Sequence, residues 1–344
     1  MRKIFYVSRR ANFSGYYILK QLIAQGVPLA GVILPEKRNP WERPLIGSLY
    51  KALYRLRCAY QNADPCKCLC SEEELARQAG IPVHTVATMK SPSFIEWLKL
   101  QQPDVLFLGG GWPELIPSEV IETPKEGVFN THPSLLPKFR GTSITRWQVL
   151  AGVDKSGSTI HKVDTHFDRG PIVAQKALDM PAKISPQELF CQLGLLGGEV
   201  VGQLFAETDN LDPAKLSMMP QEKVGKYHRQ WQWTPSELRI NWENDLQQIE
   251  SFILANHQES NKYDGPWCIL NGQSFIVREA KFNPEQTMSE EDSVRLIGDD
   301  IEIKRKGTKG FLTVSQIQVR DKLRPYRRAL SPGNFDLQEP LELA

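Results

Sequence analysis

Three side chains with hydrogen-bonding and acid–base chemistry lie at the ends of short apolar segments. Asn130 and His132 are two residues apart after the apolar segment 127–130, so in extended backbone both point the same way. Asp168 lies in a polar loop directly before a Gly-Pro turn. Asn130 and His132 can therefore line one pocket, and side chains of these three types can form hydrogen bonds and exchange protons.

The segments before Asn130 predict a parallel sheet that would position this residue and His132. Residues 3–8 and 29–34 are apolar, strand-like runs, and the helical pattern 14–25 between them ends at Gly26. Two strands joined by a helix predict a parallel pair with a right-handed crossover. The alternation continues with strands at 82–86, 104–108 and 127–130 and a helix at 94–100. Ligands bind at the carboxyl ends of strands in such sheets, which is where Asn130 and His132 fall.

The rest of the chain predicts an insertion, a linker and a second domain. Residues 35–70 interrupt the alternation with basic and aromatic side chains and a helix expected over 45–56, whereas Ser71 precedes a new acidic helix start. A helix is expected over 186–203, a linker over 209–236 and a helix over 246–255. Short strand-like runs follow at 267–270, 274–280, 301–304 and 311–319. We therefore expect an α/β chain with a catalytic domain over 1–208 and a smaller, mainly-β, barrel-like domain over 237–344.

Composition places few limits on partners. The 344 residues carry 42 basic and 40 acidic side chains, a net charge of +2, so the whole-chain charge favours no particular partner. Six cysteines are too few for a disulfide scaffold in a chain of this length, and no apolar run approaches 18 residues. We expect a cytoplasmic protein that does not bind a membrane.

The stretch Asn130-Thr131-His132-Pro133-Ser134-Leu135-Leu136-Pro137, followed 36 residues after His132 by Asp168 in Asp-Arg-Gly-Pro-Ile, resembles the formyltransferase family. That family includes glycinamide ribonucleotide, methionyl-tRNA and amino-sugar formyltransferases and the hydrolase domain of formyltetrahydrofolate dehydrogenase. The resemblance is strongest over residues 100–180 and extends over 1–205. It implies a Rossmann-like catalytic domain and the co-substrate 10-formyltetrahydrofolate.

The resemblance assigns catalytic roles to Asn130, His132 and Asp168. An acceptor amine attacks the formyl carbon, the Asn130 amide and protonated His132 stabilise the oxyanion, and Asp168 helps to move the proton, without a metal. The resemblance also implies donor contacts from three segments of the chain. These are Gly110, Gly111, Trp112, Leu115 and Ile116, then Ser134, Leu135, Leu136 and Pro137, then Val163, Asp164 and Phe167. His161 and His166 are given no role.

The acceptor is less well defined. Residues 238–242 and 265–272 resemble the start of the C-terminal domain of methionyl-tRNA formyltransferase, so methionyl-tRNA is the first hypothesis. The basic insertion and the arginines at 324, 327 and 328 suit tRNA, and they equally suit a solvated surface. The sequence Thr142-Ser143-Ile144 departs from the tRNA enzymes and favours a nucleotide-linked amino sugar, with Tyr227, Trp231 and Trp233 as candidate stacking surfaces.

A further activity stays open, whereas a metal site is considered and set aside. The same three residues would serve a formyltetrahydrofolate hydrolase, which passes the formyl group to water. Cys66, Cys68 and Cys70 form a thiol cluster, but their spacing lacks the Cys-x-x-Cys pairs typical of zinc sites. We therefore expect no metal site.

Overall fold

A computed structural model describes residues 2–10, 12–36, 71–112, 114–181, 183–221, 223, 225–256, 265–320, 329–335, 337 and 341–343. The chain forms two compact units. The first comprises Met1–Ile144, Lys155–Asp179 and Gln187–His228, and the second comprises Thr145–Asp154, Met180–Pro186 and Arg229–Ala344. The expected basic helix at 45–56, the cysteines at 66, 68 and 70 and the arginines at 324, 327 and 328 lie outside the described residues.

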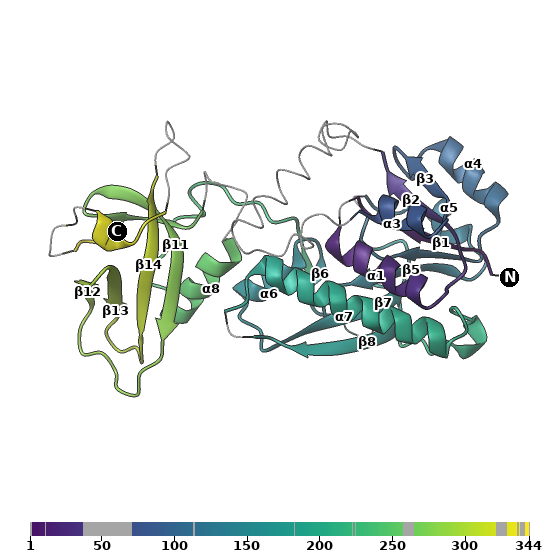
Figure 1. The fold of residues 1–344 in the computed structure, drawn as a ribbon. Coiled ribbons are helices and arrows are strands. Elements are labelled where there is room, and N and C mark those ends of the chain that lie inside the picture. The colour runs from purple at the N-terminus through teal and green to yellow at the C-terminus, as the bar shows by residue number, and fades with distance from the viewer. Residues whose placement is uncertain are drawn as a thin grey trace. The chain divides into compact units, whose positions relative to one another are not determined.

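The first unit is built on a seven-stranded sheet in the order β3-β2-β1-β4-β5-β7-β8 (Figure 1). Its strands are β1 (Ile4–Val7), β2 (Leu29–Pro35), β3 (Val83–Val86), β4 (Val105–Leu108), β5 (Gly127–His132), β7 (Lys155–Lys162) and β8 (Ile172–Asp179). The first five pair in parallel, and β7 and β8 add antiparallel. The order reverses between β1 and β4, which is the switch point where ligands bind in sheets of this kind.

Helices cover both faces of this sheet. They are α1 (Phe13–Ala24), α3 (Glu72–Gln78), α4 (Pro92–Gln101), α5 (Ser118–Glu122) and α7 (Pro186–Glu207). The helix α6 (Ile144–Leu150) belongs almost wholly to the second unit. Phe94 and Leu98 of α4 pack with Phe5 and Leu106 on one face. On the other face α7 lies beside α1 (Figure 1), where a Cβ at Gly194 would come within 3.0 Å of the Ser14 Cα atom. Glycine therefore permits this close helix–helix approach.

The N-terminal helices begin where their capping residues predict. The Asn12 side chain accepts a hydrogen bond from the Gly15 N–H group, and the Ser71 hydroxyl accepts one from Glu74 N–H. Ser91 caps α4 in the same way, with Pro92 in the first turn. The α1 cap fixes the loop that leads from β1 toward the switch point.

The second unit holds α8 (Leu246–Asn256) and a five-stranded antiparallel sheet in the order β10-β11-β14-β13-β12. The strands are β10 (Trp267–Leu270), β11 (Gln273–Asn283), β12 (Ser293–Ile297), β13 (Asp300–Lys304) and β14 (Phe311–Val319). Ile249 and Ile253 of α8 pack into one core with Phe275, Leu312 and Ile317 of the sheet. The end strands β10 and β12 do not pair with each other in the described part of the chain, so this barrel-like sheet stays open.

The predicted fold class, an α/β unit followed by a smaller mainly-β part, is confirmed. Two boundaries differ from expectation: β5 extends to His132 and α7 extends to Glu207. The elements β12, α5 and α6 were not predicted. The expected linker carries the short helix η3 (Pro213–Lys215) and the strand β9 (Tyr227–His228), and η4 (Pro332–Asn334) lies near the C-terminus. The division into functional domains at 208 and 237 stays a prediction.

Among the described residues, α7 is the one helix whose length and composition would allow it to cross a membrane. Its most apolar window is 67% buried within the fold. A core helix passes the same test, and the packing of α7 against α1 accounts for its apolar composition.

Candidate active site

A cavity of about 220 Å³ opens at the carboxyl ends of β1, β4 and β5. Its wall comes from six segments, which join residues distant in sequence at the switch point of the sheet. They are Asn12 and Ser14, then Leu108 to Trp112 with Glu114 to Ile116, then Asn130 to Pro133, Gly141 and Thr142, the residues His161, Val163, Asp164 and His166 to Asp168, and finally Phe190. All three residues predicted to act in catalysis, Asn130, His132 and Asp168, therefore face one cavity.

Asn130 and His132 reach this cavity from the last residues of β5, as their spacing of two predicts. His132 is buried, with 4% of its surface exposed. The Phe139 carbonyl lies 2.8 Å from His132 Nε2. A carbonyl oxygen only accepts hydrogen bonds, so Nε2 carries a proton and His132 Nδ1 is the ring atom that faces the acid. The extension of β5 beyond its predicted end is what fixes this orientation.

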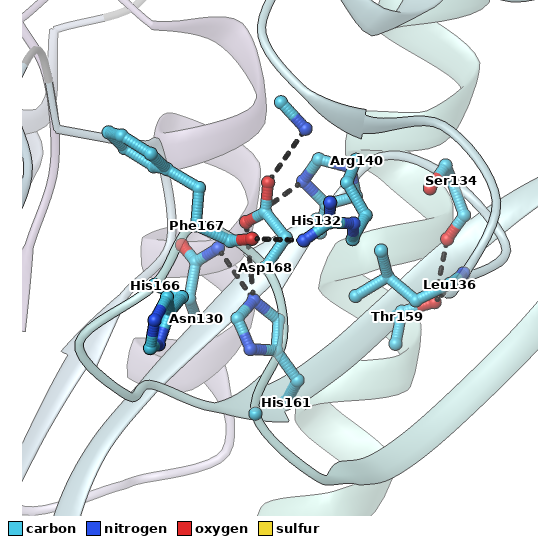
Figure 2. Close-up of polar contacts among 12 residues, drawn as sticks. Asn130, His132, Ser134, Leu136, Arg140, Thr159, His161, His166, Phe167 and Asp168 are labelled. Carbon is cyan, nitrogen blue, oxygen red and sulfur yellow. Dashed lines mark hydrogen bonds and ion pairs between the residues drawn. The ribbon is translucent and has the colours of Figure 1, made fainter. Parts of the chain in front are cut away.

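Asp168 lies between two imidazole rings (Figure 2). Its Oδ1 atom is 3.5 Å from His132 Nδ1 and 3.5 Å from His161 Nε2, and its Oδ2 atom accepts a hydrogen bond of 2.8 Å from Gly141 N–H. The backbone φ of Asp168 is 52°, in the left-handed region that costs free energy for a residue other than glycine. The loop between β7 and β8 therefore turns this carboxylate inward at a local cost.

The environment of Asp168 favours its ionised form. Burial alone would raise the pKa of this carboxyl group, but the two imidazoles and the Gly141 N–H group outweigh it and hold the pKa well below its usual range. Asp168 is therefore a carboxylate throughout the neutral range. Its Oδ1 atom faces His132 Nδ1 at 3.5 Å.

His161 is a member of the site that the sequence did not identify. It stands directly opposite Asn130 in the β5–β7 ladder, and its Nε2 atom lies 3.2 Å from Asn130 Nδ2. Its Nδ1–H group donates to the Lys162 carbonyl at 3.0 Å, which leaves Nε2 facing Asn130 and Asp168. His161 thus links the amide to the carboxylate. The only signal in the sequence was its position in a strand seven residues before Asp168.

Arg140 also supports the site without having been predicted. Its buried guanidinium donates to the Phe167 carbonyl and to the Gly225 carbonyl, each at 3.1 Å. Burial and the neighbouring Arg169 lower the pKa of Arg140, opposed by Asp168, Tyr227 and Asp164. Arg140 therefore fastens the loop that carries Asp168 to the segment after Lys223.

The predicted donor contacts divide into two groups. Gly110, Gly111, Trp112, Leu115, Ile116, Val163, Asp164 and Phe167 line the cavity. Ser134, Leu135, Leu136 and Pro137 are not part of its lining. The Ser134 carbonyl accepts a bond of 2.6 Å from the Thr159 hydroxyl, and Leu136 N–H donates to the same hydroxyl at 3.2 Å. This second group holds the loop between His132 and Phe139 in place (Figure 2), and its contact with the donor stays a prediction.

His166 lies on the rim of the cavity. Its backbone N–H donates to Asp164 Oδ1 at 2.8 Å, and its side chain is exposed. Within the described ranges, no group of three or more His, Cys, Asp or Glu side chains is arranged to hold a metal ion. The cavity therefore offers hydrogen-bond donors, the carboxylates of Glu114, Asp164 and Asp168, and apolar walls.

Comparison with known proteins agrees with this arrangement. The sequence profile described as formyl transferase matches residues 51–195, which contain the whole trio. These residues belong to the formyl transferase family. Methionyl-tRNA formyltransferase of Rickettsia rickettsii (strain Iowa) is 27% identical over 263 residues, 76% of this chain and 80% of that protein. The enzyme of the same name from Thermodesulfovibrio yellowstonii is 28% identical over 54% of this chain and 58% of its own length.

Solved formyltransferase structures share the fold. An N-formyltransferase from Helicobacter canadensis, in complex with folinic acid and dTDP-3-aminofucose, superposes with a TM-score of 0.65 at 16% identity and covers 91% of this chain and 99% of its own. The sugar 3N-formyltransferase WlaRD, with dTDP and 5-N-formyl-THF, gives a TM-score of 0.62 at 16% identity, over 91% of this chain and 97% of its own. The predicted resemblance to the formyltransferases is confirmed by the profile match and by the curated relatives.

Proposed function

We propose that this formyltransferase takes the formyl group of 10-formyltetrahydrofolate and passes it to the amino group of methionyl-tRNA. The observation that carries the reaction type is the convergence of Asn130, His132 and Asp168 on one cavity at the sheet's switch point. The curated relatives named methionyl-tRNA formyltransferase, which align over as much as 76% of this chain, support the acceptor. We place the reaction in the cytoplasm, where that acceptor is made available.

The cavity suits a flat, hydrogen-bonding ring system such as a pterin. Leu115, Ile116 and Val163 supply apolar contacts, and the Gly109-Gly110-Gly111 backbone lines one wall. A Cβ at Gly110 would come within 2.2 Å of the Ser8 hydroxyl, so the chain needs glycine there to bring its backbone so close to β1. The donor supplies an activated formyl group, and these residues would bind and orient its pterin.

The trio then acts on the reacting centre. Asn130 Nδ2–H and the protonated His132 ring donate to the oxygen that gains charge as the amine attacks. The His132 Nε2–H group is hydrogen-bonded to the Phe139 carbonyl, so the other ring nitrogen must act on the substrate. That nitrogen, Nδ1, lies 3.5 Å from Asp168 Oδ1 and holds the proton shared between the oxyanion and Asp168. Asp168 balances the imidazolium and accepts the proton that the attacking amine loses. Collapse of the oxyanion then breaks the bond between the formyl carbon and N10 of the donor, and that nitrogen takes up a proton as tetrahydrofolate leaves.

We further propose that the transfer needs no metal, because His132, His161 and Asp168 are already engaged with one another and with backbone carbonyls. Dialysis of the enzyme against EDTA should leave the rate unchanged. A rate that falls on dialysis and returns with added zinc would contradict this part of the proposal.

A nucleotide-linked amino sugar is the second candidate acceptor. Two solved structures, each covering 91% of this chain, are complexes with dTDP-3-aminofucose or dTDP. In addition, the segment Thr142-Ser143-Ile144 departs from the tRNA enzymes. The likeness at 16% identity concerns the fold, so it favours this acceptor less than the relatives favour tRNA.

A parallel acceptor screen tests the proposal. Release of tetrahydrofolate from 10-formyltetrahydrofolate is followed with initiator methionyl-tRNA, with a panel of dTDP-amino sugars, and with no acceptor. We expect release to depend on methionyl-tRNA. Release only with an amino sugar would move the function to sugar formylation, and release at full rate without any acceptor would make the protein a hydrolase.

A further inference from the structure

An exposed aromatic pair lies beside the carboxylate of the trio. Phe167 directly precedes Asp168, lines the cavity and is 41% exposed, and Tyr227 is 37% exposed. Their ring centroids are 5.8 Å apart, and the rings are inclined by 35°. Large exposed apolar side chains are common on protein surfaces singly, but two in contact at the rim of an active site suit a ring-shaped ligand.

Tyr227 is held at the rim by its backbone rather than by its side chain. Residues 225–228, which we call the strap, end in β9, which pairs in parallel with β6 (Arg140–Gly141). Thr142 N–H donates to the His228 carbonyl at 3.0 Å, and the His228 ring stacks on Phe139. The strap is therefore fixed to the same loop that positions Asp168.

Gly141 shows how closely the Tyr227 ring approaches the cavity. The φ of Gly141 is 109°, and a Cβ at this position would come within 2.9 Å of Tyr227 Cε2. The Tyr227 ring thus lies over Gly141 and beside Phe167, two residues that line the cavity, without itself being part of the lining. It forms an outer extension of the cavity wall.

Two cations flank this aromatic pair. Arg169 follows Asp168 and Lys226 precedes Tyr227, and both are exposed. No carboxylate of the described residues lies within ion-pair distance of either cation. Arg169 is close enough to act on Arg140, and Lys226 on His228, in each case lowering the pKa of the neighbour alongside burial. The rim beyond Phe167 therefore attracts anions.

The size of the cavity requires part of the donor to lie outside it. A cavity of about 220 Å³ is smaller than the roughly 300–1,000 Å³ of sites that enclose drug-sized ligands. Val163, Asp164 and Phe167 belong to one loop, so a pterin against the first two would leave the cavity past the third. A reduced folate continues from its pterin into a p-aminobenzoyl ring and then into glutamate carboxylates.

We propose that Phe167 and Tyr227, with Arg169 and Lys226, form an outer subsite for the tail of the formyl donor. The aromatic pair contacts the p-aminobenzoyl ring, and the two cations attract the glutamate carboxylates. The strap thereby contributes to donor affinity and selects donors with several glutamates. This subsite rests on the proposed folate donor and is independent of which amine accepts the formyl group.

Binding of 5-formyltetrahydrofolate, which does not need an acceptor, tests the subsite on the full chain by calorimetry. Because an aromatic contact contributes about 0.5–1.5 kcal/mol, Tyr227→Ala should weaken binding about 2- to 12-fold, whereas Tyr227→Phe should bind as the wild type does. Lys226→Ala should weaken binding of the triglutamate form more than that of the monoglutamate, and about 0.5 M salt should remove this difference. Lys99→Ala, an exposed lysine on α4, is the matched control and should change nothing.

Wild-type affinity of the Tyr227→Ala variant for 5-formyltetrahydrofolate would overturn the subsite. So would a Tyr227→Ala variant that raises only the KM of the acceptor, because the pair would then contact the acceptor's ring. A wild-type protein that does not bind 5-formyltetrahydrofolate would instead overturn the donor assignment itself, and the subsite with it.

Discussion

The strands β5 of the first unit and β14 of the second unit are both largely buried but differ in the polarity of the side chains that they bury. β14 buries apolar residues on one face, with Leu312, Val314 and Ile317 at most 3% exposed, and its free energy of burial stabilises the unit. β5 begins with the apolar residues Val128 and Phe129 but ends in Asn130, Thr131 and His132, which are polar and largely enclosed.

Burying polar groups costs free energy unless they have hydrogen-bond partners, and Asn130 and His132 find polar partners in three other segments. Phe139 accepts from His132, Asp168 faces the same ring, and His161 meets the Asn130 amide. A strand that ends in polar side chains facing other polar groups at a sheet's switch point serves chemistry, whereas a strand whose buried side chains are mostly apolar serves stability. Substitutions in the two strands should therefore have separable effects.

Loss of the β5 side chains should have the largest effect on activity. His132→Ala and Asn130→Ala should each lower kcat by about 10²- to 10⁴-fold, because each removes an oxyanion donor or the proton-transfer group. Circular dichroism should show both variants folded. A variant that keeps a near-wild-type rate would remove its residue from the mechanism.

Loss of a β14 side chain should show the opposite pattern. Leu312 is fully buried in the core of the second unit, so Leu312→Ala should lower the free energy of unfolding by about 2–5 kcal/mol. At a temperature where the variant is folded, kcat should stay within about twofold of wild type. Urea titration alongside single-turnover kinetics measures both quantities, and a large loss of kcat without loss of stability would break the distinction between the strands.

His161 should lie between these extremes, because it positions the trio. His161→Ala leaves Asp168 with one imidazole and frees the Asn130 amide, so kcat should fall by roughly 10- to 100-fold through misplacement of the reacting groups. The KM for the donor should change little. Lys99→Ala, an exposed lysine on α4 that is not part of the cavity lining, is the control with an unchanged kcat; an equal loss in both variants would contradict the positioning role.

The low pKa of Asp168 predicts a small effect of pH on stability. A carboxyl group whose pKa is depressed on folding stabilises the protein above its unfolded pKa, about 4, and loses that contribution as pH falls toward the folded value. The difference in unfolding free energy between wild type and Asp168→Asn should therefore shrink as pH falls from about 4 toward 2. A difference that stays constant over this acid range would show that the fold does not hold Asp168 as the carboxylate.

The smallest effect concerns a thiol of the second unit. Burial raises the pKa of Cys268 to about 12, so almost none of it is thiolate near pH 8. Iodoacetamide should modify Cys268 only after unfolding, as peptide mass spectrometry can show. Fast modification in the folded protein would mean that the β10 face is open.

The trio was predictable because it depends on local features. Strand periodicity places Asn130 and His132 on one side, and the family resemblance joins them to Asp168. His161 and Arg140 were not predictable as members of the site, since they meet it through strand register and through long-range contacts such as Arg140 to Gly225. The register of β5 against β7 and the position of the strap depend on the packing of the whole fold, and the spacing of residues in the sequence does not predict them.

The sequence also indicated the second unit only in part. The strands β10, β11, β13 and β14 alternate or carry apolar runs bounded by turn residues, and all four were predicted. β12 follows an acidic, polar stretch and is only half-buried, so its pattern was too weak to identify. The strand is defined by its pairing with β13 and not by the pattern of its own residues.

A double-substitution cycle tests most directly whether the buried end of β5 and Asp168 act as one unit. Single-turnover formyl transfer is measured for wild type, His132→Ala, Asp168→Asn and the double variant, with the acceptor that the screen identifies. Residues that act together lose little more in combination than singly, so we expect the double variant to be nearly as active as the slower single variant. Losses that multiply in the double variant would show that His132 and Asp168 act independently, and would contradict their joint role in moving the proton.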